Sequence, residues 1–118
     1  MAAANTLNYN RREVELARFA KALGHPARIA ILRYLASLDT CCFNEISKEL
    51  PIADSTVSQH MSELKDAGLI QVEYEPPRVK YCINKENWEL AKKYLKEFMD
   101  IKIAKTDLQN LVCDDEFK

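Results

Sequence analysis

The sequence predicts one mainly α-helical domain that carries a small β-hairpin. Apolar residues recur at helical spacing in five segments of the 118-residue chain, and the period changes from 3.6 to 2 only between Gly68 and Lys85. The composition agrees, since 47% of the residues are apolar, 30% are charged and only two are glycine. A chain of this length fills one hydrophobic core, so we expect a single domain.

Two helices are expected to open the domain. The first runs from Arg12 to Leu23 and has a broad apolar face, and the break Gly24-His25-Pro26 ends it. Pro26 suits the first turn of a second helix, because its missing N–H costs nothing there. This second helix, ARIAILRYLASL, is apolar around most of its circumference, so we expect it to be buried.

A helix-turn-helix is predicted to follow. The segment CCFNEISKEL keeps helical spacing, with Asp39 or Thr40 as its cap and Pro51 as its end. After a tight connection, Asp54 or Ser55 is expected to cap a helix through STVSQHMSELKDA, which Gly68 ends. Two short helices about four residues apart are typical of a helix-turn-helix.

A hairpin and a last helix complete the predicted domain. The segments LIQVEYE and RVKYCIN are β-branched and aromatic, and Pro76-Pro77 separates them, so they indicate two paired strands. From Lys85 to about Ile103 the apolar residues lie on two adjacent helical lines. A surplus apolar face on a small domain is commonly an interface, so we expect a dimer.

This order of elements is that of a winged helix-turn-helix (ααααββα), in which a helix fits the major groove and the hairpin reaches along the backbone. The stretches LGHPARIAIL, SKELPIADSTVSQHMSELKDAGLI and RVKYCIN resemble the ArsR-type (ArsR/SmtB) repressors, over roughly Leu16 to Lys102. The resemblance implies a homodimer, formed by the first and last helices, that presents two recognition helices to successive major grooves of a palindromic operator. The residues expected at the dimer interface are Leu16, Phe19, Trp88, Ala91, Leu95 and Phe98.

Short polar side chains near the start of the recognition helix predict contacts with double-stranded DNA. Free N–H groups and the helix dipole favour phosphate there, and Gln59 can read adenine with two hydrogen bonds. The expected DNA-binding residues are Ser55, Thr56, Ser58, Gln59, His60, Lys65, and Arg78 and Lys80 of the hairpin. Two alternatives stay open: Asp54 and Ser55 only cap the helix, or the polar residues form an ordinary solvated face.

The net charge gives little support to nucleic-acid binding. Seventeen basic residues against 18 acidic residues leave a formal charge of −1, so non-specific affinity for DNA should be modest and salt-sensitive. A winged-helix module that binds protein instead of DNA is therefore a rival hypothesis.

Cysteines are the candidate effector site. Many members of the family that the sequence resembles use a Cys-x-Cys motif on the helix before the recognition helix, but here Asn44 stands in the place of the second cysteine. Cys41 and Cys42 nevertheless fall at a predicted helix N-terminus, which favours thiolates, and adjacent thiolates suit soft ions. The favoured effector is trivalent arsenic or antimony, As(III) or Sb(III), with Cys113 as a third donor and Cys82 as a poorer candidate. Thiol oxidation with a distant partner, another ligand or none, and a packing role for the pair stay open.

The sequence gives less support to other classes of protein, such as enzymes and secreted or membrane proteins. The chain offers two histidines and no recognisable nucleophile-base pair, so we expect no enzyme and no obligatory cofactor. No apolar run suggests a signal peptide or a membrane span, which predicts a cytoplasmic protein. We expect residues 1–10 to form a disordered arm, residues 11–104 the domain, and residues 105–118 a tail that extends the last helix or frays.

Overall fold

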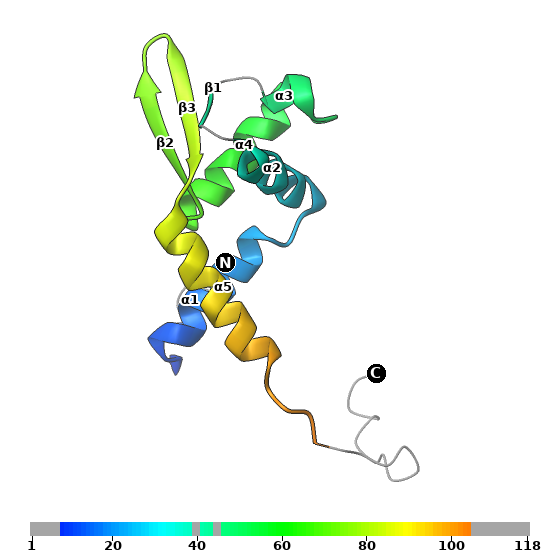
Figure 1. Ribbon diagram of the computed structural model, residues 1–118, viewed down its shortest axis with the longest axis vertical. Helices are drawn as coiled ribbons and strands as arrows, with labels where there is room; N and C mark the ends of the chain where they lie inside the picture. The colour runs from blue at the N-terminus through cyan, green and yellow to red at the C-terminus, as the bar shows by residue number, and fades with distance from the viewer. Residues whose placement is uncertain (1–7, 39–40, 44–45, 105–118) are drawn as a thin grey trace.

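The computed structural model describes residues 8–38, 41–43 and 46–104. The elements run in the order α1 (Arg11–Ala22), α2 (Pro26–Ser37), β1 (Cys42–Phe43), α3 (Ile46–Glu49), α4 (Asp54–Asp66), β2 (Ile70–Glu75), β3 (Arg78–Ile83) and α5 (Lys85–Met99) (Figure 1). The predicted winged helix-turn-helix order is confirmed, and β1 is an addition to it.

Local signals set the boundaries of α1 and α2. The Asn10 side chain accepts a hydrogen bond from the Glu13 N–H at 2.8 Å, and the Glu13 carboxylate accepts one from the Asn10 N–H at 3.4 Å, which forms a capping box. Pro26 occupies the first turn of α2, and His25 caps that helix by accepting a hydrogen bond from the Ala27 N–H at 3.0 Å. The predicted break at Gly24-His25-Pro26 is therefore confirmed.

The prediction of a helix over residues 41–50 is wrong for the first half of this segment. Cys42–Phe43 is an extended strand that pairs with β3, and the helix comprises only Ile46–Glu49. The free edge of β3 offers backbone partners to this segment, and a ladder pairing satisfies its N–H and C=O groups as well as a helix would.

The sequence predicts the end of helix α4 correctly but not its start. Its N-cap is Ala53, which makes no side-chain capping bond, so neither Asp54 nor Ser55 is the cap that we expected. At the other end, Gly68 has a φ of +84°, a left-handed conformation that ends the helix as predicted.

The hairpin forms as the alternating pattern predicts. In the antiparallel pair of β2 and β3, Ile70 lies opposite Ile83 and Glu75 lies opposite Arg78. The strand β1 pairs with the other edge of β3, which gives a three-stranded sheet in the order β1-β3-β2.

The last helix, α5, is shorter than predicted. Its N-cap Asn84 accepts a hydrogen bond from the Asn87 N–H at 3.0 Å, and the Asn87 side chain donates to the Gly68 carbonyl at 2.9 Å. The helix ends at Met99, before the predicted end near Ile103. The tail that we expected over residues 105–118 lies outside the described residues.

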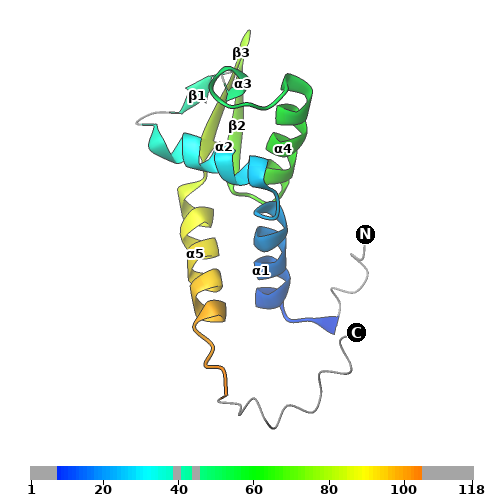
Figure 2. The same ribbon diagram turned by 90° about the vertical axis from the view of Figure 1, so that its right-hand side faces the viewer.

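The hydrophobic core lies between α2, α4 and the sheet. Ile31 of α2 and Leu64 of α4 are fully buried there, beside Leu69 at the start of the hairpin. Figure 2 shows α1 and α5 lying side by side on the far side of α2 from the hairpin tip. No helix among the described residues is long and apolar enough to cross a membrane.

Candidate nucleic-acid interface and cysteine pair

An exposed polar stripe runs along α4. Ser55, Ser58 and Gln59, three of the residues predicted to contact DNA, are exposed. Ser62 is also exposed and lies one turn beyond Ser58, so it continues the stripe. Ser62 was absent from the sequence prediction, although its spacing of three and four residues from Gln59 and Ser58 was a sufficient signal.

Other predicted residues of α4 lie off the centre of this stripe. Thr56 is half-buried, and Lys65 is exposed in the last turn of the helix. The Asp54 side chain lies outside what the structure describes.

His60 is not on the exposed face, which contradicts its predicted place among the DNA contacts. Only 7% of the residue is exposed, and its ring centroid lies 4.4 Å from that of His25. Nδ1 of His60 lies 3.3 Å from Nη1 of Arg28. Because a guanidinium can only donate, this contact requires a neutral imidazole whose Nδ1 accepts.

The electrostatics of His60 agree with a neutral ring. Burial lowers its pKa below the usual value of 6.5, and the neighbouring His25 and the Arg28 guanidinium lower it further, while Glu63 acts in the opposite direction. Sequence reasoning placed His60 with its polar neighbours because its partners come from α2, which the local pattern does not show.

Arg28 joins three helices and was missed by the sequence prediction. From α2, its Nε donates to the Ala22 carbonyl at 2.7 Å and its Nη2 to the Lys21 carbonyl at 3.3 Å, while Nη1 reaches His60 of α4. A single arginine within the apolar stretch ARIAIL was a weak signal for such a role.

A second arginine ties α1 to the C-terminal end of α4. Arg18 donates a hydrogen bond to the backbone carbonyl of Asp66, the last residue of α4. Helix α4 is thus attached to α1 directly at its C-terminal end, by Arg18, and through Arg28 of α2 at His60 in its middle.

The hairpin carries fewer available charges than predicted. Lys80 pairs with Glu73 across the two strands at 3.5 Å, so its ammonium already has an acidic partner. Arg78 is exposed at the first position of β3, beside the turn.

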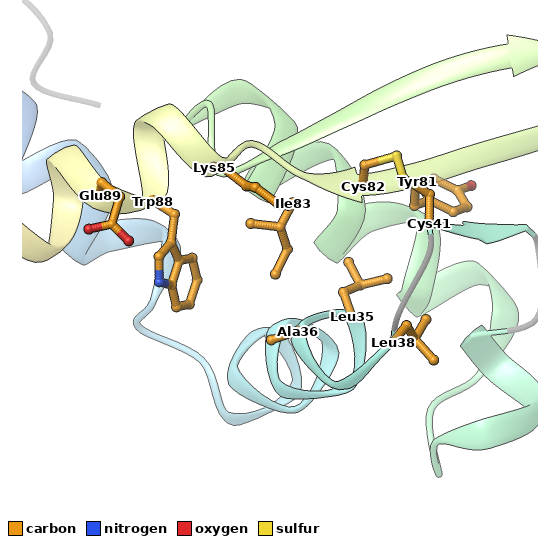
Figure 3. A pocket seen from close by; sticks show the side chains of 10 residues that line it. All are labelled: Leu35, Ala36, Leu38, Cys41, Tyr81, Cys82, Ile83, Lys85, Trp88 and Glu89. Carbon is orange, nitrogen blue, oxygen red and sulfur yellow. A yellow bond between two sulfur atoms is a disulfide. The ribbon is translucent and has the colours of Figure 1, made fainter.

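Cys41 is bonded to Cys82 and not held beside Cys42 as a thiolate. The disulfide joins α-carbons 4.7 Å apart, and 41 residues separate the two cysteines in the sequence. The register explains the pairing: Cys42 lies opposite Tyr81, which places Cys41 opposite Cys82 in the antiparallel ladder (Figure 3).

This geometry corrects two expectations about the cysteines. Cys41 and Cys42 lie before the helix, at and within a strand, so no helix N-terminus acts on them. Cys82, which we took as the poorer candidate, is the bonded partner. The Cys42 side chain and Cys113 lie outside what the structure describes, and the described residues hold no group of three or more metal-ligating side chains.

The predicted dimer residues divide into two groups. Phe19 and Ala91 are buried in the core of this chain, where they hold α1 against α5. Leu16, Trp88 and Leu95 are half-buried, and Phe98 is 55% exposed.

Further apolar side chains extend the exposed group beyond α5. Met99 is 73% exposed, and Ile101 and Ile103 follow it on the same exposed segment. These residues were not among the predicted ones, although the sequence pattern continued through them.

The fold and the exposed face of α4 define a winged helix-turn-helix protein, in which the second helix of the motif is the recognition helix. Residues 25–72 match the family model described as bacterial regulatory protein, arsR family. The chain is 31% identical over 72 residues to the HTH-type transcriptional regulator YgaV of Escherichia coli, across 61% of this chain and 73% of that one. It belongs to the arsR family of bacterial regulatory proteins.

Other relatives agree with this assignment. The HTH-type transcriptional regulator CmtR of Mycobacterium tuberculosis is 38% identical over 73 residues, which cover 61% of this chain and 60% of that relative. The NMR structure of the cadmium metal-sensor CMTR from Mycobacterium tuberculosis has a TM-score of 0.51 at 33% identity and is covered over 98% of its length, with 84% of this chain. An ArsR-like transcriptional regulator from Rhodococcus sp. RHA1 shares the fold, with a TM-score of 0.63 at 21% identity, over 74% of this chain and 81% of that one.

Proposed function

We propose that this chain is a transcriptional repressor that binds a palindromic operator in double-stranded DNA as a homodimer. The observation that carries the proposal is the exposed stripe on α4, formed by Ser55, Ser58, Gln59 and Ser62, on the helix that precedes the hairpin. An α-helix fits the major groove, which is about 12 Å wide, and short side chains let its backbone approach the base edges.

Each part of this surface has a distinct role in the proposal. Gln59 reads adenine through paired hydrogen bonds, and the serines bond to bases or phosphates. Arg78 at the hairpin turn contacts phosphate and carries no sequence information. Lys80 contributes less than we expected, because Glu73 offsets its charge.

A homodimer would cover the exposed apolar side chains around α5. Phe98 and Met99 at the end of α5, and Ile101 and Ile103 just after it, are all more than half exposed, and α5 already packs against α1. Apolar groups clustered on one end of a small protein are commonly covered by a second subunit. A two-fold dimer then presents its recognition helices about 10 base pairs apart.

The proposed effector is a thiophilic ion bound at Cys41. In the reduced protein, the antiparallel register holds the thiols of Cys41 and Cys82 opposite each other, which suits a soft ion with two sulfur ligands. As(III) and Sb(III) remain the favoured ions, and the relative that is titled a cadmium sensor adds cadmium to the ions to be tested.

A second candidate effector is the redox state of the same pair. The bond between Cys41 and Cys82 links the segment before α3 to the hairpin, so forming or breaking it changes a connection between the helix-turn-helix and the wing. Oxidation by a peroxide or a low-molecular-weight disulfide would form the bond, and a dithiol would reduce it.

The experiment is a fluorescence-anisotropy titration of labelled duplex DNA from the region upstream of the chain's own gene. The expected result is saturable binding to a duplex with two half-sites and loss of affinity when one half-site is scrambled. Equal affinity for the intact, the half-scrambled and an unrelated duplex would refute operator recognition and favour the module that binds protein.

The effector is identified with the protein reduced by a phosphine, desalted and titrated with arsenite, antimonite or cadmium on the DNA complex. Three single variants, Cys41→Ser, Cys82→Ser and Cys42→Ser, locate the site. Loss of ion response in the first two, with Cys42→Ser unchanged, supports the cross-strand pair. Loss of the ion response in Cys41→Ser and Cys42→Ser alone would support the adjacent pair Cys41–Cys42 as the site. An unchanged response in all three variants would contradict a cysteine site at this end of the sheet.

A further inference from the structure

A cavity of about 530 Å³ lies between α2, β3 and the first turns of α5. Figure 3 shows Trp88 directing its indole ring toward α2 and the disulfide closing the opposite end. The walls come from Leu35, Ala36, Leu38, Cys41, Tyr81, Cys82, Ile83, Lys85, Trp88 and Glu89. The cysteine pair proposed above as the effector site forms part of these walls, and no role described so far uses the apolar part between Leu35, Ile83 and Trp88.

The size of the cavity favours a small molecule. Ligand sites for small molecules usually measure about 300–1,000 Å³, and this cavity falls within that range. An α-helix with its side chains is about 10–12 Å across, so two turns of a partner helix would fill more space than the cavity offers.

The walls favour an uncharged, mainly apolar ligand. Leu35, Leu38, Ile83 and the Trp88 ring present hydrocarbon and aromatic surface. Of the lining side chains, Lys85 and Glu89 carry opposite charges one helical turn apart, so they offset each other and leave no net charge to pair with an ion. Burying an unpaired charge among apolar walls would cost more than the contacts return.

We propose that this cavity, whose wall includes the Cys41–Cys82 pair, is a binding site for a small, uncharged ring compound. The flat indole of Trp88 offers a stacking surface, and Lys85 and Glu89 can donate to and accept from a hydroxyl on the ligand. Occupancy excludes water from the side of α2 that carries Leu35 and Leu38.

Trp88 couples this site to the proposed dimer face. Its ring also lines a second cavity, of about 360 Å³, with Leu23, Leu69 and Leu95. A ligand that reorients the indole therefore changes both cavities, and Cys82 in the wall connects the site to β3 of the hairpin. The effect on DNA affinity rests on the proposed function, whereas binding in the cavity does not.

The test uses the single tryptophan of the chain. In the full-length protein labelled with nitrogen-15, Trp88 gives one indole N–H signal, which is followed during titration with 2-naphthalenemethanol. The expected result is a saturable shift, with affinity at least about tenfold higher than for 2-naphthoate or naphthylmethylammonium, the matched anion and cation. Absence of saturation up to about 1 mM, or equal affinity for all three probes, would overturn the proposal.

Three variants locate the probe. Ala36→Phe fills the cavity from an exposed position of α2 and is expected to weaken binding at least about tenfold, whereas Ser37→Phe, on the neighbouring exposed position outside the walls, leaves binding unchanged. Urea unfolding of these two variants and of Lys92→Phe shows that each is folded. If Lys92→Phe, in the wall of the second cavity, abolishes binding while Ala36→Phe does not, the probe lies in the second cavity and the proposal is wrong.

A parallel measurement of DNA binding distinguishes this inference from the proposed function. Saturable, Ala36→Phe-sensitive binding of the probe supports the cavity site whether or not the protein binds an operator. Binding of the operator without any response of Trp88 to the probe supports the proposed function and refutes the cavity site.

Discussion

Replacing Arg28 by alanine should destabilise the domain by about 2–3 kcal/mol. The change removes a hydrogen bond of 2.7 Å to the Ala22 carbonyl and two longer ones, of 3.3 Å, to Lys21 and His60. A hydrogen bond from a charged donor contributes about 1.5–3 kcal/mol, and a buried acceptor left without a partner costs about 1–3 kcal/mol. Because Arg28 is only half-buried and two of its bonds are long, we expect the total loss to stay near the value of one strong charged bond.

The assay is urea unfolding followed by far-ultraviolet circular dichroism. Arg33→Ala is the matched control, since Arg33 lies exposed on the same helix, and it should change the free energy of unfolding by less than about 0.5 kcal/mol. Arg28→Lys should lose about half as much as Arg28→Ala, because an ammonium lacks the planar fork that reaches three acceptors. If Arg28→Ala and Arg33→Ala unfold within about 0.5 kcal/mol of each other, Arg28 does not join the helices as argued.

Three further predictions concern the site and the helix end. Gln59→Ala should reduce discrimination between operator variants, whereas Arg78→Ala should weaken binding to all duplexes alike and reduce the slope of log affinity against log salt concentration by about one. Equal, sequence-independent losses of affinity in both variants would contradict base reading by Gln59. The pKa of His60 is lowered in the folded state, so the unfolded chain binds the proton first as pH falls through 6.5, and the free energy of unfolding should decrease below that pH. The substitution His60→Gln should flatten this pH dependence, which is measured as urea midpoints between pH 5 and 8. Gly68→Ala should lower the free energy of unfolding by about 1–2 kcal/mol, because the residue has a φ of +84° and a Cβ there would lie 2.8 Å from the Asn87 side chain; an unchanged denaturant midpoint would contradict this.

Most of the fold could be predicted because its signals are local. Pro26 marks the start of α2, Gly68 marks the end of α4, and alternation between Ile70 and Ile83 gives the hairpin, each within a few residues of the structural feature. These signals depend on backbone geometry that a residue imposes on itself and its neighbours.

The errors arose where distant segments meet. The strand of Cys42 exists because β3 has a free edge, and two residues are too short to show a period of their own. His60 is polar and sits among polar neighbours, yet a contact with Arg28, 32 residues away, holds it inside. The bond between Cys41 and Cys82 depends on the register of two strands, which composition and spacing do not reveal.

In the proposed complex with its operator, DNA would become a structural component of α4, because the N-cap residue of this helix makes no side-chain capping bond. Ala53 has no side chain that could accept from the first N–H groups of the helix, so this N-cap stabilises its first turn less than the asparagine caps stabilise those of α1 and α5. A phosphate oxygen at this position would complete the cap, and part of the binding energy would be used to order the turn. The amide protons of residues 55–57 should therefore exchange slowly with solvent only in the complex, which makes them local reporters of operator occupancy.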